Sequence, residues 1–386
     1  ALQIAMMIGQ FVLLMLFLGS SKTIDIVPGD KKGITFEKDY YGNDSEVRLV
    51  RSWTRLLTTD HKRLTELGGK PIRGFLLTGP PGVGKTYLAR CLASDIDGGF
   101  LGLTGSDLTS MWMGMGAFKV MGFANKAKNY ASKYGACVAY IDEIDAIGAS
   151  RGGGANVMNP MVGALGGGGM GVLQRLLSAM DGMEEEDARA YAKNALRKFF
   201  GMEPIPLPRV LFVGATNRPD ILDAALKRPG RFDQQIAIGL PDKTTRRALF
   251  GGYLTKVTSE LSTEQIEDLV NDTQGVSHAF IATAVEKGSV RQTLLRDASA
   301  VTYLDVVHAI EEQILGLANP IADMDPKQRA QVAYHEAGHT VMMRLAEPNK
   351  RISSVSIVRR AAGILGYALN VEQREIYAKP LAHVAA

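Results

Sequence analysis

The sequence predicts an α/β fold in which a parallel sheet carries helices on both of its faces. Three short runs are almost continuously apolar, as expected of strands buried on both faces of such a sheet: residues 74–79, 137–142 and 209–217. Helical stretches lie between these runs, and a glycine-rich loop follows the first run directly. We therefore expect an α/β domain over residues 34–240.

The composition is that of an ordinary folded protein. The chain has 386 residues, of which 46% are hydrophobic and 22% charged, and this length suggests two or three domains. The net charge of +4 is mild, and no block of lysine and arginine indicates nucleic acid as a partner. Cys91 and Cys137 lack a CxxC spacing, which fits buried packing in a reducing compartment without a disulfide framework.

The chain opens with an apolar segment. Residues 1–19 carry no formal charge, and their length is close to the ~20 residues that cross a bilayer as a helix. We predict a transmembrane helix over residues 1–20 and a polar linker over residues 21–33. A buried core helix is the alternative, whereas the basic start and cleavage site of a signal peptide are missing. The following domains are expected on the cytoplasmic or an equivalent side because lysines follow the segment: Lys22, Lys31 and Lys32.

A phosphate-binding loop, GPPGVGKT, occupies residues 79–86. Its glycines let successive backbone N–H groups point at phosphate oxygens, and the helix that follows adds the positive end of its dipole. Lys85 is placed to neutralise phosphate charge and Thr86 to hold Mg²⁺. The predicted ATP site uses the whole loop: Gly79, Pro80, Pro81, Gly82, Val83, Gly84, Lys85 and Thr86.

Two later strands end in polar residues that suit the same site. Asp142 ends the second apolar run and would hold Mg²⁺, while the neighbouring Glu143 would activate the attacking water. Alone, an Asp-Glu pair at a strand end is weak evidence for a nucleotide site. Together with the glycine loop it is strong evidence. Asn217 ends the third run, where it would meet the γ-phosphate. The expected chemistry is Mg²⁺-dependent hydrolysis of ATP.

A second kind of site is encoded at residues 335–339, which read HEAGH. His335 and His339 are four residues apart and share one face of a helix, so their imidazoles can ligate one zinc ion. Glu336 would then take a proton from the zinc-bound water. A chance match on a surface helix is the alternative to a peptidase site.

A helical region separates the two sites. Residues 241–319 predict a small helical domain, with apolar spacing at Leu304, Val307, Ile310 and Ile314. Asp325 and Pro326 predict the N-cap and the first turn of the helix that carries HEAGH. Residues 352–370 predict a strand pair. We assign residues 320–386 to the N-terminal part of a mainly helical zinc-peptidase domain.

One segment carries a specific resemblance. Residues 214–233, GATNRPDILDAALKRPGRFD, resemble the segment that marks AAA ATPases, and residues 33–375 resemble the FtsH-type AAA proteases. The resemblance implies that Asn217 senses the γ-phosphate. It also implies that Arg228 and Arg231 reach as arginine fingers into the site of a neighbouring subunit. Arginines supplied in trans imply a closed ring, here a homo- or hetero-hexamer.

The sequence SMWMGMGAF at residues 110–118 resembles the pore loop of the same family, in which an aromatic residue precedes G-x-G. The resemblance implies that Trp112, Met113 and Gly114 contact a polypeptide in the central channel of the ring. Without the resemblance, Trp112 would be interpreted as an ordinary core aromatic.

The chain also departs from the family pattern. The third zinc ligand of the family is an acidic residue well downstream, and nothing in residues 352–386 matches that motif. His278 and Phe280 replace a glycine and an aspartate near the expected nucleotide base. The segment 184–207 is longer than expected. The first residue is Ala1 rather than Met, so we expect a longer natural protein.

The leading hypothesis is a membrane-anchored hexameric enzyme that binds ATP, Mg²⁺ and Zn²⁺. It would pull unfolded or membrane proteins past Trp112 and hydrolyse them with Glu336. The expected location is a bacterial inner membrane or its organellar equivalent, with the ATPase and peptidase parts on the cytoplasmic, matrix or stromal side.

A membrane-bound unfoldase with an inactive peptidase domain is one alternative. A nucleotide-binding scaffold without ATP turnover is another alternative. The presence of all the expected ATPase residues argues against this scaffold: Lys85, Asp142, Glu143, Asn217, Arg228 and Arg231.

Overall fold

A computed structural model describes most of the chain in two compact units, Ala1–Gly239 and Leu240–Ala386. The described residues are 23–30, 33–58, 66–68, 72–108, 115–148, 171–182, 196–197, 200, 202, 209–321, 323–348, 350–360 and 365–372. The predicted transmembrane helix over residues 1–20 lies outside them. Within the described part of the chain, no helix combines the length and apolar character that a membrane span requires.

The first unit is built on a six-stranded sheet with the strand order β1-β3-β4-β5-β2-β6. The strands are β1 (Ile24–Ile26), β2 (Gly74–Thr78), β3 (Gly99–Thr104), β4 (Ala136–Asp142), β5 (Arg209–Thr216) and β6 (Gln234–Ala237). Every neighbouring pair is parallel except β1 and β3, which are antiparallel. The three apolar runs of the sequence are β2, β4 and β5, so the predicted parallel sheet is confirmed.

The strand order determines which loops meet. Strand β5 lies between β2 and β4, and its Gly214 is in register with Leu76 of β2 and with Ile141 of β4. The carboxyl ends of parallel strands point to the same edge of a sheet, where open α/β folds bind their ligands. The loops that follow these three strands therefore lie next to one another.

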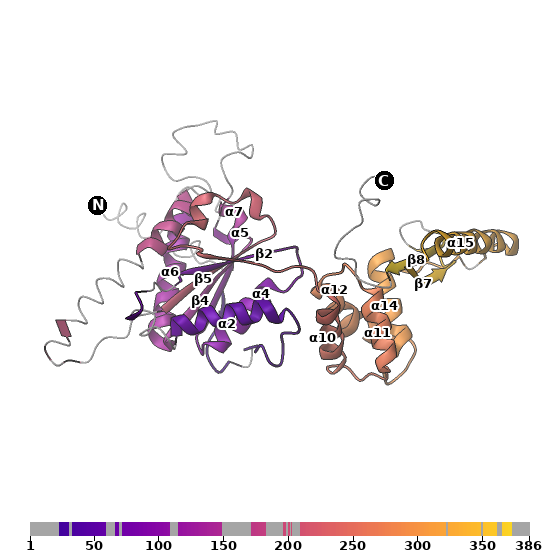
Figure 1. Ribbon diagram of the computed structural model, residues 1–386, viewed down its shortest axis with the longest axis horizontal. Coiled ribbons are helices and arrows are strands. Elements are labelled where there is room, and N and C mark those ends of the chain that lie inside the picture. Colours follow the sequence, from indigo (N-terminus) through magenta and orange to yellow (C-terminus); the bar gives the residue numbers. More distant parts are fainter. Residues whose placement is uncertain are drawn as a thin grey trace, which may run out of the picture. The chain divides into compact units, whose positions relative to one another are not determined.

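Helices cover both faces of the sheet because alternate residues of each strand point in opposite directions. The helices of the first unit include α2 (Asp44–Thr58), α4 (Lys85–Asp95), α5 (Gly105–Leu108), α6 (Met115–Tyr134) and α7 (Asp145–Gly148). Phe75 and Tyr140 belong to the buried cluster shared with α2 and α4. Leu76 and Ile141 belong to the cluster shared with α6, α7 and the helical residues 171–182. Figure 1 shows the sheet with α2 and α4 on one side.

Part of the predicted linker belongs to the sheet. Residues 24–26, inside the predicted linker 21–33, form the edge strand β1. Lys126 of α6 donates to Thr23 Oγ1 at 2.9 Å and to Asp25 Oδ2 at 2.5 Å. A three-residue strand carries too little alternation to be recognised in the sequence. Its position depends on β3 and Lys126, which are both far away along the chain.

The second unit joins a helical bundle to a hairpin and a long helix. Its helices are α10 (Lys243–Leu254), α11 (Thr263–Asp272), α12 (His278–Thr283), a π-helical segment (Ala284–Ser289), α13 (Val290–Leu295), α14 (Tyr303–Leu315) and α15 (Pro326–Ala346). Strands β7 (Lys350–Ser356) and β8 (Tyr367–Glu372) form an antiparallel hairpin, as predicted. Asp325 is the N-cap of α15, although its side chain makes no capping hydrogen bond.

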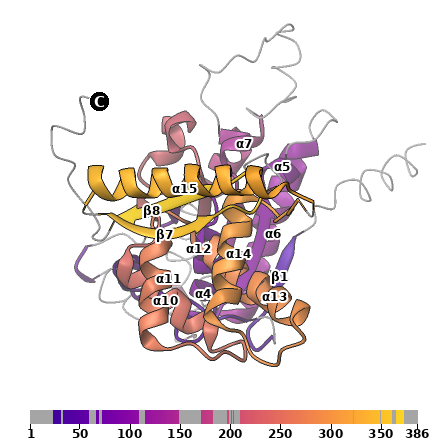
Figure 2. The ribbon, with the colours of Figure 1, turned by 90° about the vertical axis from the view of Figure 1, so that its right-hand side faces the viewer.

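Polar contacts connect the helical bundle to the hairpin. Figure 2 shows β7 and β8 lying between α15 and the helices α11 and α14. Glu311 of α14 accepts hydrogen bonds from Arg360 Nη2 at 2.8 Å and from Ser354 Oγ at 2.6 Å. Arg351 of β7 pairs with Asp268 and Asp272 of α11. These contacts join elements that lie on the two sides of residue 319.

Candidate functional site

The loop that follows β2 requires glycine. Gly79 has φ 147°, and a Cβ atom there would lie 2.0 Å from the carbonyl oxygen of Ile238. Gly82 and Gly84 have φ values of 76° and 90°, in the left-handed region that glycine alone adopts without strain. The loop thus has the conformation that turns backbone N–H groups toward a bound anion. Helix α4 begins directly after it, at Lys85.

Lys85 is enclosed by three oxygen atoms. Its Nζ donates to Gly79 O at 2.8 Å, to Pro80 O at 2.9 Å and to Asn217 Oδ1 at 2.7 Å. Burial lowers the pKa of Lys85, whereas nearby carboxylates act in the opposite direction. An ammonium group has three hydrogens, and all three are used here. A phosphate would replace at least one of these acceptors.

Thr86 and Asp142 form an oxygen-rich pair beside Lys85. Thr86 Oγ1 donates to Asp142 Oδ2 at 2.9 Å and lies 2.9 Å from the hydroxyl of Tyr140. Hydroxyl and carboxylate oxygens are the ligands that Mg²⁺ prefers, so this pair fits the metal. Burial, and next the Asp142 carboxylate, raises the pKa of Tyr140, so this hydroxyl is protonated at neutral pH.

Glu143 occupies a turn with unusual backbone geometry. Its φ is 48°, which is uncommon for a residue with a side chain. Its N–H donates to Asp142 Oδ1 at 3.0 Å, and Ile144 N donates to Ala215 O at 2.9 Å. The side chain of Glu143 is exposed. The turn therefore presents a carboxylate to solvent at the same edge of the sheet as the glycine loop.

The end of β5 is joined to the Glu143 turn by a second set of contacts. Thr216 Oγ1 donates to Asp145 Oδ1 at 2.7 Å and accepts from Arg218 N at 2.9 Å. Sequence reasoning missed Thr216, Asp145 and Tyr140. In the sequence, a tyrosine inside an apolar run is interpreted as a core residue. Only the structure shows that the Tyr140 hydroxyl reaches Thr86.

The two candidate arginine fingers differ in their surroundings. Arg231 donates to both carboxylate oxygens of Asp181, at 3.1 and 2.8 Å, and to Ala225 O at 2.7 Å. The hydrogen bond with Asp181 is the main cause that raises the pKa of Arg231. Arg228 follows a short 3₁₀ helix, Ala224–Lys227, and is exposed. Only Arg228 therefore presents an exposed guanidinium, while Arg231 is held within its own chain.

The HEAGH motif lies on α15. His335 and His339 are exposed, and their Nε2 atoms lie 3.0 Å apart. Two imidazole nitrogens that converge in this way fit ligands of zinc. Glu336 is only 8% exposed and packs against Gly366, where a Cβ atom would lie 2.8 Å from Glu336 Cγ. Among the described residues, no cluster of three or more histidine, cysteine or acidic side chains suits a metal. The described residues therefore offer two candidate zinc ligands, His335 and His339.

The predicted pore residues Trp112, Met113 and Gly114 lie outside the described residues, and α6 begins directly after them at Met115. Most of the segment 184–207 also lies outside.

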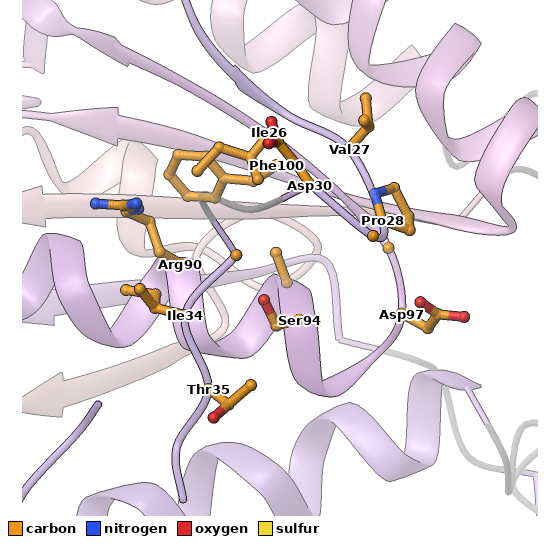
Figure 3. Close-up of a pocket in the computed structure, with 14 residues that line it drawn as sticks. Ile26, Val27, Pro28, Asp30, Ile34, Thr35, Arg90, Ser94, Asp97 and Phe100 are labelled. Carbon is orange, nitrogen blue, oxygen red and sulfur yellow. The ribbon is translucent and has the colours of Figure 1, made fainter. Parts of the chain in front are cut away.

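A cavity of about 230 Å³ lies at the other end of α4 (Figure 3). Its lining includes Asp30 from the chain after β1 and Arg90, Ser94 and Asp97 from α4 and the turn that follows. Lys85 begins the same helix, and a helix of eleven residues is about 16 Å long. This cavity is therefore separate from the glycine loop.

Comparison with known proteins agrees with both sites. Residues 75–240 match the ATPase family associated with various cellular activities (AAA), and residues 322–382 match peptidase family M41. Proteins named ATP-dependent zinc metalloprotease FtsH are similar over most of the chain. The chain is similar to the FtsH proteases in both matched regions.

Three relatives illustrate the similarity. The FtsH of Chlorobium luteolum is 36% identical over 89% of this chain and 44% of its own length. That of Rhodothermus marinus is 36% identical over 91% of this chain and 45% of its own length. The Helicobacter pylori protein is 32% identical over 93% of this chain and 51% of its own length. The chain thus spans about half the length of these relatives. ATP with Mg²⁺ and zinc are the cofactors of the family, in agreement with the glycine loop and the histidine pair.

Proposed function

We propose that this chain provides the motor and the start of the peptidase of a membrane-anchored, ATP-dependent zinc metalloprotease. The observation that carries the proposal is the convergence of three distant segments on one site. Lys85 is joined to Asn217, and Thr86 is joined to Asp142, by direct side-chain hydrogen bonds of 2.7 and 2.9 Å. The motor belongs to a chain that also presents a convergent histidine pair.

In the proposed motor, the glycine loop and Lys85 bind the phosphates of ATP. Thr86 and Asp142 hold Mg²⁺, which when bound neutralises phosphate charge. Glu143 orients the attacking water and accepts its proton. Asn217 contacts the γ-phosphate. Its hydrogen bond with Lys85 supports this role, because two side chains that lie together can contact the same phosphate.

Arg228 is proposed to act on the site of a neighbouring subunit. Its exposure supports a role outside its own chain. Arg231 donates hydrogen bonds to Asp181 and Ala225 O. It would hold the segment that carries both arginines in place, in addition to any contact across the subunit interface. A closed ring, a hexamer in the family, follows from this arrangement. Trp112, Met113 and Gly114 would contact unfolded or membrane proteins in the central channel.

In the proposed peptidase, His335 and His339 hold zinc. When bound, zinc lowers the pKa of its water and polarises the scissile carbonyl. Glu336 accepts the proton of that water, and its contact with Gly366 fixes the side chain on the hairpin side of α15. The third zinc ligand is proposed to lie outside the described residues. Residues 1–20 are proposed to anchor the protein in a bacterial inner membrane or its organellar equivalent. The motor and peptidase would then lie on the cytoplasmic, matrix or stromal side.

Degradation of a loosely folded protein tests the proposal. The full-length protein is compared with its Glu336→Gln variant, with and without ATP. We expect peptides from the parent protein only when ATP is present, and none from the variant, while both hydrolyse ATP. ATP hydrolysis by both proteins without peptides from either would instead favour an unfoldase with an inactive peptidase domain.

A further inference from the structure

Tyr140 is a buried tyrosine whose hydroxyl reaches the nucleotide site. It lies on β4, two residues before Asp142, and is 2% exposed. Its ring stacks on Phe100, with 5.9 Å between the ring centroids, in the cluster shared with α4. The hydroxyl lies 2.9 Å from Thr86 Oγ1. A phenylalanine would keep the ring packing, so packing alone does not explain the oxygen.

Thr86, Asp142 and Tyr140 form one hydrogen-bonded group. Thr86 Oγ1 donates to Asp142 Oδ2 at 2.9 Å and lies 2.9 Å from the Tyr140 hydroxyl, a contact in which either hydroxyl can be the donor. Tyr140 also forms a side-chain hydrogen bond with Asp142. The Tyr140 hydroxyl thus contacts both residues that would hold Mg²⁺.

We propose that Tyr140 is a positioning residue for Mg²⁺, because its hydroxyl holds the Thr86 hydroxyl and the Asp142 carboxylate in place for the metal. The proposal rests on the ATP site described under the proposed function and adds a residue to it. Asp142 and Tyr140 both contact the Thr86 hydroxyl, so its position is held from two sides. Such supporting contacts to metal ligands commonly tune the affinity for the metal.

The test compares the full-length protein with its Tyr140→Phe variant. Mn²⁺ serves as the probe for the metal, and its binding is measured by electron paramagnetic resonance in the presence of a non-hydrolysable ATP analogue. The affinity of the same analogue is also measured in EDTA, without metal. We expect Mn²⁺ to bind about fivefold more weakly to the variant, which corresponds to one lost hydrogen bond. The affinity measured in EDTA should not change.

Two further variants separate positioning from a purely structural role. Tyr367→Phe removes another buried tyrosine hydroxyl, which accepts from Arg360 Nη2 at 2.8 Å, and should leave Mn²⁺ affinity at the parent value. In a Thr86→Ser background the side chain rotates more freely, because serine lacks the branching methyl group. Loss of the Tyr140 hydroxyl should then weaken Mn²⁺ binding more than it does beside threonine.

The outcomes distinguish the two proposals. A parent protein that binds neither the analogue nor Mn²⁺ would overturn the proposed ATP site, and this inference with it. A parent protein that binds both, with the same Mn²⁺ affinity in Tyr140→Phe, would overturn only the role of Tyr140. A lower melting temperature of the variant with unchanged Mn²⁺ affinity would show that the hydroxyl is merely structural.

Discussion

Lys85 and Asn217 are 132 positions apart in the sequence, and a hydrogen bond of 2.7 Å joins Nζ of the lysine to Oδ1 of the asparagine. This contact links the start of α4 to the end of β5. It is possible because β5 lies directly beside β2, the strand that leads into the glycine loop.

Replacement of Asn217 tests this link. Asn217→Ala leaves Lys85 with the carbonyls of Gly79 and Pro80, which are sufficient to keep the ammonium near the loop. We expect ATP hydrolysis to fall about 100-fold, as when one transition-state donor is removed. The affinity for ATP should change little, and both quantities are measured on the same preparation. The exposed Asn125 of α6 gives a control, since Asn125→Ala should hydrolyse ATP like the parent. Equal losses of binding and hydrolysis in Asn217→Ala would contradict the assigned role.

The two arginines should respond differently to replacement. Arg231→Ala removes the contacts to Asp181 and to Ala225 O and should lower the free energy of unfolding by about 1–3 kcal/mol. Arg228→Ala removes an exposed side chain and should leave the melting temperature unchanged while ATP hydrolysis is lost.

Mixing experiments show whether Arg228 acts on a neighbour. Lys85→Ala subunits lack a working phosphate loop of their own but keep Arg228. When mixed with Arg228→Ala subunits, they should restore part of the ATP hydrolysis, because an intact loop meets an intact arginine wherever the two kinds of subunit are neighbours. No recovery in mixed rings would argue that Arg228 does not act in trans.

His278 predicts a pH-dependent stability. Burial lowers its pKa from 6.5 to about 4. Between these two values the unfolded chain binds more protons at this imidazole than the folded chain does. The free energy of unfolding should therefore fall as the pH decreases from about 6.5 to about 4, by at most ~3 kcal/mol. Urea unfolding of the parent and of His278→Asn over this range measures the effect. The asparagine variant should lose less stability toward low pH, and parallel curves would exclude a contribution from His278.

The buried ion pair between α14 and the hairpin gives a further prediction. Arg360 is 5% exposed and Glu311 8% exposed. Arg360→Met leaves the carboxylate of Glu311 buried without its cation, which should cost about 3–5 kcal/mol in the free energy of unfolding. Replacing both residues, Arg360→Met with Glu311→Leu, should recover most of that loss. Thermal unfolding of the three proteins provides the comparison. A double variant as unstable as the single one would show that the hairpin needs the charges themselves.

The sequence predicted the parts of the fold that carry strong periodic signals. Buried parallel strands such as β2 and β4 are continuous apolar runs, and the glycine loop is defined by spacing alone. The hairpin of β7 and β8 was also predictable. The short strand β1 was not, because its pairing with β3 and its contact with Lys126 come from distant residues.

The candidate site was predictable where chemistry requires a particular residue type, as for Lys85, Asp142 and the histidine pair. It was not predictable where an ordinary core residue contributes a polar atom. Tyr140 lies in an apolar strand, and Asp181 lies on a helix outside any motif. Nevertheless Tyr140 contacts Thr86, and Asp181 contacts Arg231. The sequence likewise gave no reason to separate Arg228 from Arg231.

In the proposed enzyme, ATP hydrolysis in the first unit drives proteolysis that depends on the second. The most direct test measures ATP hydrolysis and peptide release from a stably folded substrate in the same reaction, with the parent, Glu143→Gln and Glu336→Gln proteins. We predict that Glu143→Gln still binds ATP but loses both activities, whereas Glu336→Gln loses only peptide release. Degradation of the folded substrate by Glu143→Gln at the parent rate would contradict the claim.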